Sequence, residues 1–274
     1  MVSQEQRRRQ LAREKFLRQQ QRRTSARRKA NMRNSVIASV LGVVVIGSVA
    51  LYTTGVLKND DDKKTNASAD VTPSAAPTSK APDPCAKPAA GSIEKETWKK
   101  EPAMSIDTSA KYTMKLATTC GDIGIALKTS AAPHTVNSFD FLAGKGFFDH
   151  TKCHRLTTNG IYVLQCGDPT GVGSGGPGYT IPDENLKDAS LKGNKYPAGT
   201  VAMANTGQKH TGGSQFFLVY KDSPLPPSYT PFGTIDAAGL KVLDKIAAAG
   251  ENTGAGDGAP NATVVINKAT VTKS

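Results

Sequence analysis

Residues 151–180, TKCHRLTTNGIYVLQCGDPTGVGSGGPGYT, hold the side chains whose types and spacing best fit a chemical site. The pattern predicts two short apolar strands with a turn between them, followed by a glycine-rich loop. Arg155 and Gln165 fall on the facing strands, so a hairpin can bring a cation and an amide side by side. Residues 199–220 repeat the order of strand, polar loop and strand. We expect the rest of the chain to be arranged around these two segments.

Three other kinds of site match this region in part, and the surrounding sequence argues against each. A GxGxxG spacing at 171–176 fits a dinucleotide loop, but Gly-Pro-Gly follows where a helix should begin. Ser174 and Ser214 lack the Gly-x-Ser-x-Gly elbow of hydrolases. A zinc site would need ligands on one face, whereas strand neighbours alternate and no CxxC or HxxxH pair occurs. The residues weighed for zinc are His150, Cys153, His154 and Cys166. We therefore expect no cofactor and no metal.

Five short motifs stand in a fixed order along the two segments. They are His154-Arg155, Gln165-x-Gly167-Asp168-Pro169-Thr170-Gly171, Gly175-Gly176-Pro177-Gly178-Tyr179, Ala202-Met203-Ala204-Asn205 and Gly213-Ser214-Gln215-Phe216-Phe217. In series they resemble the signature segments of the cyclophilins, which are peptidyl-prolyl cis-trans isomerases. The resemblance covers residues 111–273 and implies a mainly β fold, a closed eight-stranded antiparallel barrel capped by two helices.

Hydrophobic periodicity agrees with a fold of many short strands and two helices. Apolar residues alternate over 112–116 and 123–127, which predicts a β-hairpin. Pro133 opens a helical stretch that ends at Gly144, and a second short helix covers 240–246. A last strand is expected over 263–271. Many short strands with two isolated helices fit a closed barrel.

The chemistry that the resemblance implies is rotation about an X-Pro peptide bond, against a barrier of about 20 kcal/mol. No bond is made or broken, so the site must bind the twisted amide better than either planar form. This requires an apolar slot for the proline ring and a fixed hydrogen-bond donor. The matching positions imply Arg155 as the donor, Gln165 as the amide that orients it and Phe217 as the floor of the slot.

Further positions that match substrate-binding residues of the family come from the same motifs. They are Tyr162, Val163, Gly173, Ala204, Asn205, Thr206, Gln215, Leu225 and Tyr229. Asn205 is expected to receive the substrate through its main-chain groups. Pro224 and Tyr229 stand where many eukaryotic members have Trp and His. We therefore expect cyclosporin, which contacts that Trp in the family, to bind weakly.

Two functions from different classes follow from these residues. In the first, the protein is an isomerase that accelerates proline-limited folding of extracytoplasmic proteins. In the second, it is a tethered chaperone or binding module for proline-containing segments, with little turnover. The set of Arg155, Gln165 and Phe217 favours the isomerase. The altered wall, and a hairpin two residues longer than the commonest family form, keep the binding module open.

The net charge of +12 over 274 residues is concentrated at the N-terminus. Residues 1–34 carry twelve Lys or Arg against two Glu, a net of +10, which leaves +2 for the rest. Such a tail can be merely solvated, can lie against anionic lipid headgroups, or can bind RNA or DNA. No aromatic-interleaved pattern supports nucleic acid. We favour anionic lipid or a role in setting membrane topology.

Residues 36–57 contain 22 residues without a charge, enough to cross roughly 30 Å of hydrocarbon. A cleavable signal peptide is the alternative, but the apolar stretch is long and no small-x-small cleavage site follows in the usual place. We favour a single retained transmembrane helix. The positive-inside rule then makes 1–35 a basic cytoplasmic tail and places the catalytic domain outside the cell membrane. By resemblance, this organisation indicates a membrane-anchored bacterial form.

Residues 58–110 are rich in Pro, Ala, Thr and Lys and predict a flexible linker. A packed extension is possible from residue 91, because a few large apolar residues appear there. Trp98, the single tryptophan of the chain, either packs on the domain or stays exposed in this linker.

Four cysteines allow three pairings if all are bonded. Strand alternation puts Cys153 and Cys166 on opposite faces if Arg155 and Gln165 share one, so we expect no bridge between them. The pattern leaves the state of the other two cysteines open.

Overall fold

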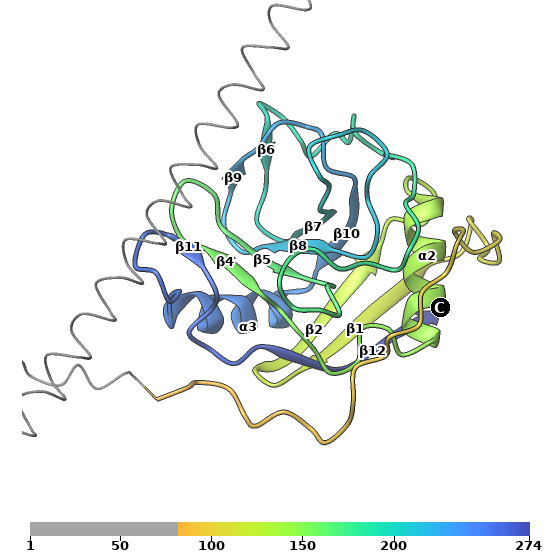
Figure 1. Ribbon diagram of the computed structural model, residues 1–274. Coiled ribbons are helices and arrows are strands. Elements are labelled where there is room, and N and C mark those ends of the chain that lie inside the picture. The colour runs from red at the N-terminus through yellow and green to blue at the C-terminus, as the bar shows by residue number, and fades with distance from the viewer. Residues whose placement is uncertain (1–81) are drawn as a thin grey trace, which may run out of the picture. The chain divides into compact units, whose positions relative to one another are not determined.

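The computed structural model describes residues 82–274 of the chain. The predicted basic tail (1–35) and transmembrane helix (36–57) lie outside these residues. Across 82–274, no helix has the length and apolar character that crossing a bilayer requires. The described part is mainly β, with two helices and long connecting loops (Figure 1).

The N-terminal half of the domain begins with a hairpin and a helix. Strands β1 (Tyr112–Thr118) and β2 (Gly121–Leu127) pair antiparallel, and alternate residues of β1 are buried, as the sequence pattern predicts. Helix α2 (Pro133–Gly144) begins at a proline, whose missing N–H costs nothing in the first turn. Its next two backbone N–H groups donate to the Glu184 carboxylate.

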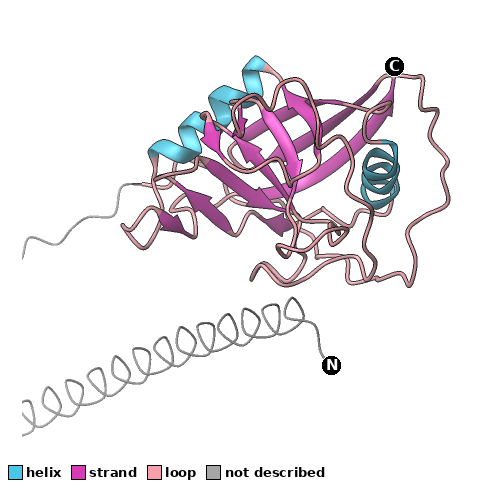
Figure 2. Cartoon of the chain, turned by 90° about the horizontal axis from the view of Figure 1, so that it is seen from above, coloured by secondary structure: helices cyan, strands magenta, loops and turns pink. Residues whose placement is uncertain are grey.

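The remaining elements are short strands and one further helix. They are β3 (Thr151–Lys152), β4 (Arg155–Thr157), β5 (Val163–Cys166), β6 (Lys195–Tyr196), β7 (Thr200–Met203), β8 (Phe216–Val219), β9 (Ser223–Pro224), β10 (Pro231–Ile235), α3 (Ala237–Ala248), β11 (Asp257–Gly258) and β12 (Val265–Lys273). The Asp236 carboxylate caps α3 by accepting from Gly239 N. Figures 1 and 2 show α2 and α3 on opposite sides of the strands.

The predicted closed eight-stranded barrel is wrong in strand number and in closure. The main sheet has ten strands in the order β11-β4-β5-β8-β7-β10-β2-β1-β12-β3, and within the described chain its edge strands β11 and β3 do not pair with each other. Each edge strand is two residues long. Between β3 and β4 the chain turns from pairing with β12 to pairing with β5, so the curled sheet stays open. β6 and β9 form a separate two-stranded sheet.

Aromatic side chains fill the main core between α2 and the sheet. The Phe139 ring, on the buried face of α2, lies 4.5 Å from the Phe232 ring and 5.4 Å from the Phe216 ring, centroid to centroid. A second, smaller apolar cluster lies around Phe217 and Tyr196 and is distinct from this core. The second cluster supplies the apolar part of the candidate site.

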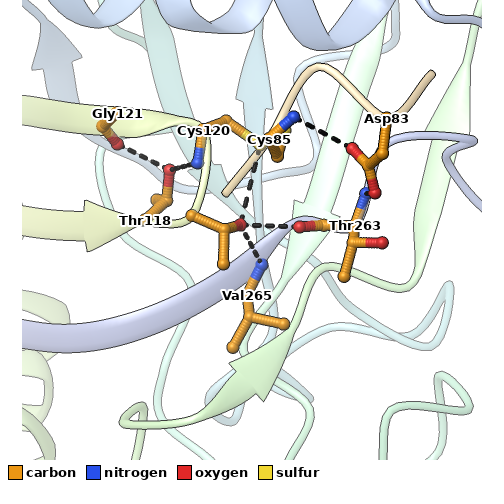
Figure 3. The surroundings of a disulfide bond; sticks show 8 residues. Asp83, Cys85, Thr118, Cys120, Gly121, Thr263 and Val265 are labelled. Atoms are coloured by element: carbon orange, nitrogen blue, oxygen red, sulfur yellow. Dashed lines mark hydrogen bonds between the residues drawn. A yellow bond between two sulfur atoms is a disulfide. The ribbon is translucent and has the colours of Figure 1, made fainter. Parts of the chain in front are cut away.

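The segment before β1 is fastened to the domain, and its contacts begin before residue 91. Cys85 forms a disulfide with Cys120 in the turn between β1 and β2 (Figure 3). The Asp83 carboxylate accepts from the backbone N–H groups of Cys85 and Thr263. Trp98, for which the sequence left two placements open, packs against Phe141 with ring centroids 5.0 Å apart.

The expectation that Cys153 and Cys166 stay apart is also wrong, because they form a disulfide with Cα atoms 4.0 Å apart. Strand alternation does not apply across this stretch, since Cys153 and His154 lie between β3 and β4 rather than within a strand. His154 N donates to Gln165 O, and the bend brings Cys153 beside the end of β5. All four cysteines of the chain are therefore paired.

Candidate active site

Arg155 and Gln165 meet as the hairpin pattern predicts. They are directly opposite in the β4–β5 register, so their side chains share one face of the sheet. Arg155 Nη1 donates to Gln165 Oε1 at 3.3 Å. The Gln165 amide in turn donates to Gln215 Oε1, and the Gln215 amide donates to the Gly175 carbonyl, both at 2.9 Å. Each amide is thereby held in one orientation.

Asp257 on β11 also holds the Arg155 guanidinium. No local pattern indicates this contact, because the two residues are 102 positions apart. Arg155 Nε and Nη2 donate to the two carboxylate oxygens of Asp257, each at 2.7 Å. These bonds lower the pKa of Asp257 and raise the pKa of Arg155. A guanidinium has five N–H groups. Three are used here, which leaves two to donate to a bound molecule.

The loop that carries Asp257 is itself fixed by a carboxylate. Glu251 accepts from Thr253 N, from the Thr253 hydroxyl and from Gly256 N. Gly258 has no room for a side chain, since an added Cβ would lie 2.4 Å from Glu251 Oε2. Asp257 is therefore presented to Arg155 from a tightly folded turn.

A cavity of about 200 Å³ adjoins this pair of side chains. Its lining residues are Arg155, Ile161, Val163, Gln165, Ala204, Asn205, Phe217, Leu225 and Tyr229. The structure thus brings together all three residues predicted as catalytic and five of those predicted to bind substrate. The Phe217 ring is buried and lies 5.4 Å from the Tyr229 ring. An apolar slot beside a cation is the result.

Tyr196 braces the far wall of this cavity. Its hydroxyl donates to Tyr229 O at 2.7 Å and accepts from Tyr229 N at 3.1 Å. Burial raises the pKa of Tyr196 to about 12, so this hydroxyl keeps its proton. The brace fixes the backbone of Tyr229, whose side chain closes the slot.

Tyr162, predicted to line the proline slot, is not among the lining residues. Its ring packs against Tyr220 at 6.0 Å, and Lys221 Nζ lies 4.6 Å from the ring centroid. Side chains alternate along an extended chain, so Ile161, Val163 and Gln165 face the slot while Tyr162 faces away. Counting in steps of two back from Gln165 would have selected Ile161 from the sequence.

The other predicted substrate-binding residues, Gly173, Thr206 and Gln215, line a larger neighbouring cavity of about 980 Å³. Its glycine-rich wall is built on Asp168, which accepts from the backbone N–H groups of residues 170 and 172–174. Burial alone would raise the pKa of Asp168, but these bonds and that from the Thr170 hydroxyl lower it to about 2. The two cavities share Gln165, Ala204 and Asn205.

None of this geometry offers a metal centre or a nucleophile with its base. Over residues 82–274, no three His, Cys, Asp or Glu side chains gather in a way that could hold a metal ion. Cys153 and Cys166, two of the four candidate zinc ligands, are joined in a disulfide. The arrangement can grip an apolar ring and donate hydrogen bonds beside it.

Comparison with known proteins gives the same family over the same residues. A family model described as "Cyclophilin type peptidyl-prolyl cis-trans isomerase/CLD" matches residues 113–271. The chain is 52% identical over 169 residues to a "Probable peptidyl-prolyl cis-trans isomerase B" of Mycobacterium leprae, covering 57% of this chain and 56% of the relative. A protein of the same description from Mycobacterium tuberculosis is 50% identical over 165 residues, covering 57% and 53%.

Shorter relatives and a solved structure extend the comparison. A "Peptidyl-prolyl cis-trans isomerase" of Helicobacter pylori is 41% identical over 133 residues, which cover 48% of this chain and 77% of that protein. The crystal structure of a Cryptosporidium parvum cyclophilin type peptidyl-prolyl cis-trans isomerase superposes with a TM-score of 0.51 at 26% identity, covering 60% of this chain and 99% of that one. The matched region is about half the length of the mycobacterial relatives.

Proposed function

The chain belongs to the cyclophilin-type peptidyl-prolyl cis-trans isomerase family, and on that premise we propose that it catalyses cis–trans rotation about X-Pro peptide bonds. The observation that carries the proposal is the fixed Arg155 guanidinium, with two N–H groups to spare, beside a slot floored by Phe217. Proline-containing polypeptides are the substrates that this arrangement fits.

The proposed mechanism needs no covalent step. The proline ring enters the slot between Phe217, Val163 and Leu225, where apolar contact holds it in place. As the amide twists, its nitrogen loses resonance with the carbonyl and becomes a hydrogen-bond acceptor. An Arg155 N–H aimed at that nitrogen binds the twisted form better than either planar form, which lowers the barrier.

Asn205 clamps the substrate backbone in this proposal. Its side-chain amide already donates to Ser228 O, and its side-chain oxygen accepts from Gly207 N. These bonds leave the main-chain groups of Asn205 to pair with the extended substrate. With Leu225 and Tyr229 forming the wall in place of an indole, we expect cyclosporin to bind weakly.

The pH dependence of turnover separates this mechanism from acid–base chemistry. Arg155 has a raised pKa and Asp257 a lowered one, so both stay charged from pH 6 to 9. We expect kcat/KM for a short X-Pro peptide to be nearly flat over that range. A bell-shaped profile would contradict the mechanism. Tight binding without turnover at any pH would instead favour a tethered binding module.

The proposal extends to where the enzyme acts. Disulfides persist in oxidising compartments, and both disulfides of this domain fit an extracytoplasmic location. The sequence of 1–57 adds a basic cytoplasmic tail, suited to anionic lipid headgroups, and a single membrane-spanning helix. The enzyme would then assist folding of proteins outside the membrane.

Fractionation of cells that express the chain tests this location. We expect the protein to stay in the membrane fraction after an alkaline wash, with its cysteines protected from alkylation until a reductant is added. Free thiols in the intact cell, or release of the full-length chain by the wash, would refute the location and leave the isomerase proposal standing.

A further inference from the structure

The larger cavity has one wall that the family match does not include. Lys99, Lys100 and Glu101 line it, and the family model begins only at residue 113. The other lining residues include the glycine-rich loop and residues 204–206. Residues 99–101 thus lie outside the part of the chain that the family model covers.

Two anchors hold this wall in place. On one side, Trp98 N donates to Pro177 O at 2.8 Å, and the Trp98 ring packs on Phe141. The approach is close enough that a Cβ on Gly178, whose φ is +90°, would lie 2.8 Å from Trp98 O. On the other side, the Asn137 side-chain amide donates to the carbonyls of residues 102 and 103 and accepts from Ser105 N. Residues 99–101 are therefore fixed between two contact points.

The wall carries unbalanced positive charge. Lys99, Lys100 and Glu101 are the only charged residues that line the cavity in the described chain. Glu101 offsets one of the two lysine charges, which leaves the lining with a net charge of +1, and Glu101 Oε1 lies 3.4 Å from His134 Nδ1. Both lysine side chains are exposed, and neither forms an ion pair with any residue of 82–274. The cavity presents two ammonium groups that an anion could meet.

The larger cavity also continues into the proline slot, since Gln165, Ala204 and Asn205 line both. A polypeptide whose proline occupies the slot must place neighbouring residues in or beside the larger cavity. Building on the proposed isomerase function, we propose that this cavity receives an acidic side chain near the proline, and that Lys99 and Lys100 select it.

The size of the preference follows from the exposure of the two lysines. A single exposed ion pair strengthens an interaction by about 1.5- to 5-fold, because water screens it and the side chains lose freedom. Two lysines sharing one carboxylate should give about a threefold to tenfold preference in kcat/KM. The preference should shrink above about 0.1 M salt, where the screening length falls below about 10 Å.

The test compares peptides that differ in one side chain. Each X-Pro peptide carries Glu or Gln at one position, from one to four residues before or after the proline, and kcat/KM is measured with the full-length chain. The activity of the variant Lys99→Ala/Lys100→Ala is compared with that of a control variant, Lys87→Ala/Lys95→Ala. The control removes the same charge from the same segment, at exposed positions that do not line the cavity. The basic tail is present in every sample, so its attraction for acidic peptides is common to all.

We expect a Glu/Gln ratio of about three to ten at one or two positions for the wild type and for Lys87→Ala/Lys95→Ala. In Lys99→Ala/Lys100→Ala the ratio should fall to near one. A ratio of one in the wild type, or an equal fall in both variants, would overturn the proposal. If no peptide is turned over, the isomerase proposal fails instead. In that case the same peptides, each carrying a fluorescent label, are used in anisotropy measurements of binding affinity. The ratio of the Glu to the Gln affinity then decides whether these two lysines prefer Glu.

Discussion

Replacing Asp257 by Asn should slow isomerisation although Asp257 lines neither cavity and reaches the proposed site only through Arg155. The carboxylate accepts from Arg155 Nε and Nη2, and it fixes the plane in which the two remaining guanidinium N–H groups lie. Asn keeps the shape but offers one acceptor, and its amide turns a donor toward the guanidinium. Arg155 keeps its charge and its bond to Gln165 while losing its fixed orientation.

The expected loss can be worked from the exposure of the pair. Hydrogen bonds to charged groups contribute about 1.5–3 kcal/mol each when shielded from water. The side chains of Arg155 and Asp257 are 39% and 55% exposed, so screening reduces their joint contribution to about 1 kcal/mol. If that stabilisation is needed to aim the donor, kcat/KM falls about fivefold. The loss should appear in kcat, because the donor acts on the twisted amide and not on the planar one.

The matched control is Asp122→Asn, which breaks an ion pair of similar exposure with Lys115 on the β1–β2 hairpin, outside both cavities. Peptide isomerisation and thermal unfolding are measured on both variants, and Asp257→Glu tests for partial rescue. Unchanged kcat in Asp257→Asn, or an equal loss in Asp122→Asn, would refute the positioning role. A rise in KM at constant kcat would place Asp257 in substrate binding instead.

Three further predictions concern stability. Replacing both Cys85 and Cys120 by Ser should lower the free energy of unfolding by about 4 kcal/mol, because that disulfide closes a loop of 35 residues, and an unchanged urea midpoint would contradict this. Burial lowers the pKa of His154, so as the pH falls below about 6.5 the imidazole binds a proton in the unfolded chain before it does in the folded one. The free energy of unfolding should therefore decrease below about pH 6.5, and His154→Gln should remove this dependence on pH. Glu184→Ala leaves two backbone N–H groups of α2 without their acceptor and should cost about 1–2 kcal/mol in thermal unfolding, with a smaller loss in Glu184→Gln.

Local patterns predicted the parts of the site that local geometry determines. Arg155 and Gln165 face each other because a hairpin sets its own register. Phe217, which only the family resemblance implies, reaches the same slot from the neighbouring strand β8. The family resemblance alone implies that Tyr162 lines the slot, whereas the two-residue alternation of the strand turns Tyr162 away and brings Ile161 in.

Contacts between distant segments could not be predicted from patterns of this kind. Asp257 reaches Arg155 across 102 positions, and no periodicity relates them. The disulfide between Cys153 and Cys166 depends on a bend before β4, where the assumption of a continuous strand fails. The open sheet has the same origin, because two-residue edge strands leave too weak a pattern to show where pairing ends.

The central claim is that Arg155 donates to the twisted X-Pro amide, and the rate of isomerisation of a short X-Pro peptide by the Arg155→Ala chain tests it most directly. With circular dichroism and both disulfides unchanged, we expect kcat/KM about 10²- to 10³-fold below that of the wild type, the loss typical of a removed transition-state donor. Equal rates for the two proteins would contradict the claim. If both rates were negligible, the slot would hold proline without turning it, and the tethered binding module would replace the enzyme.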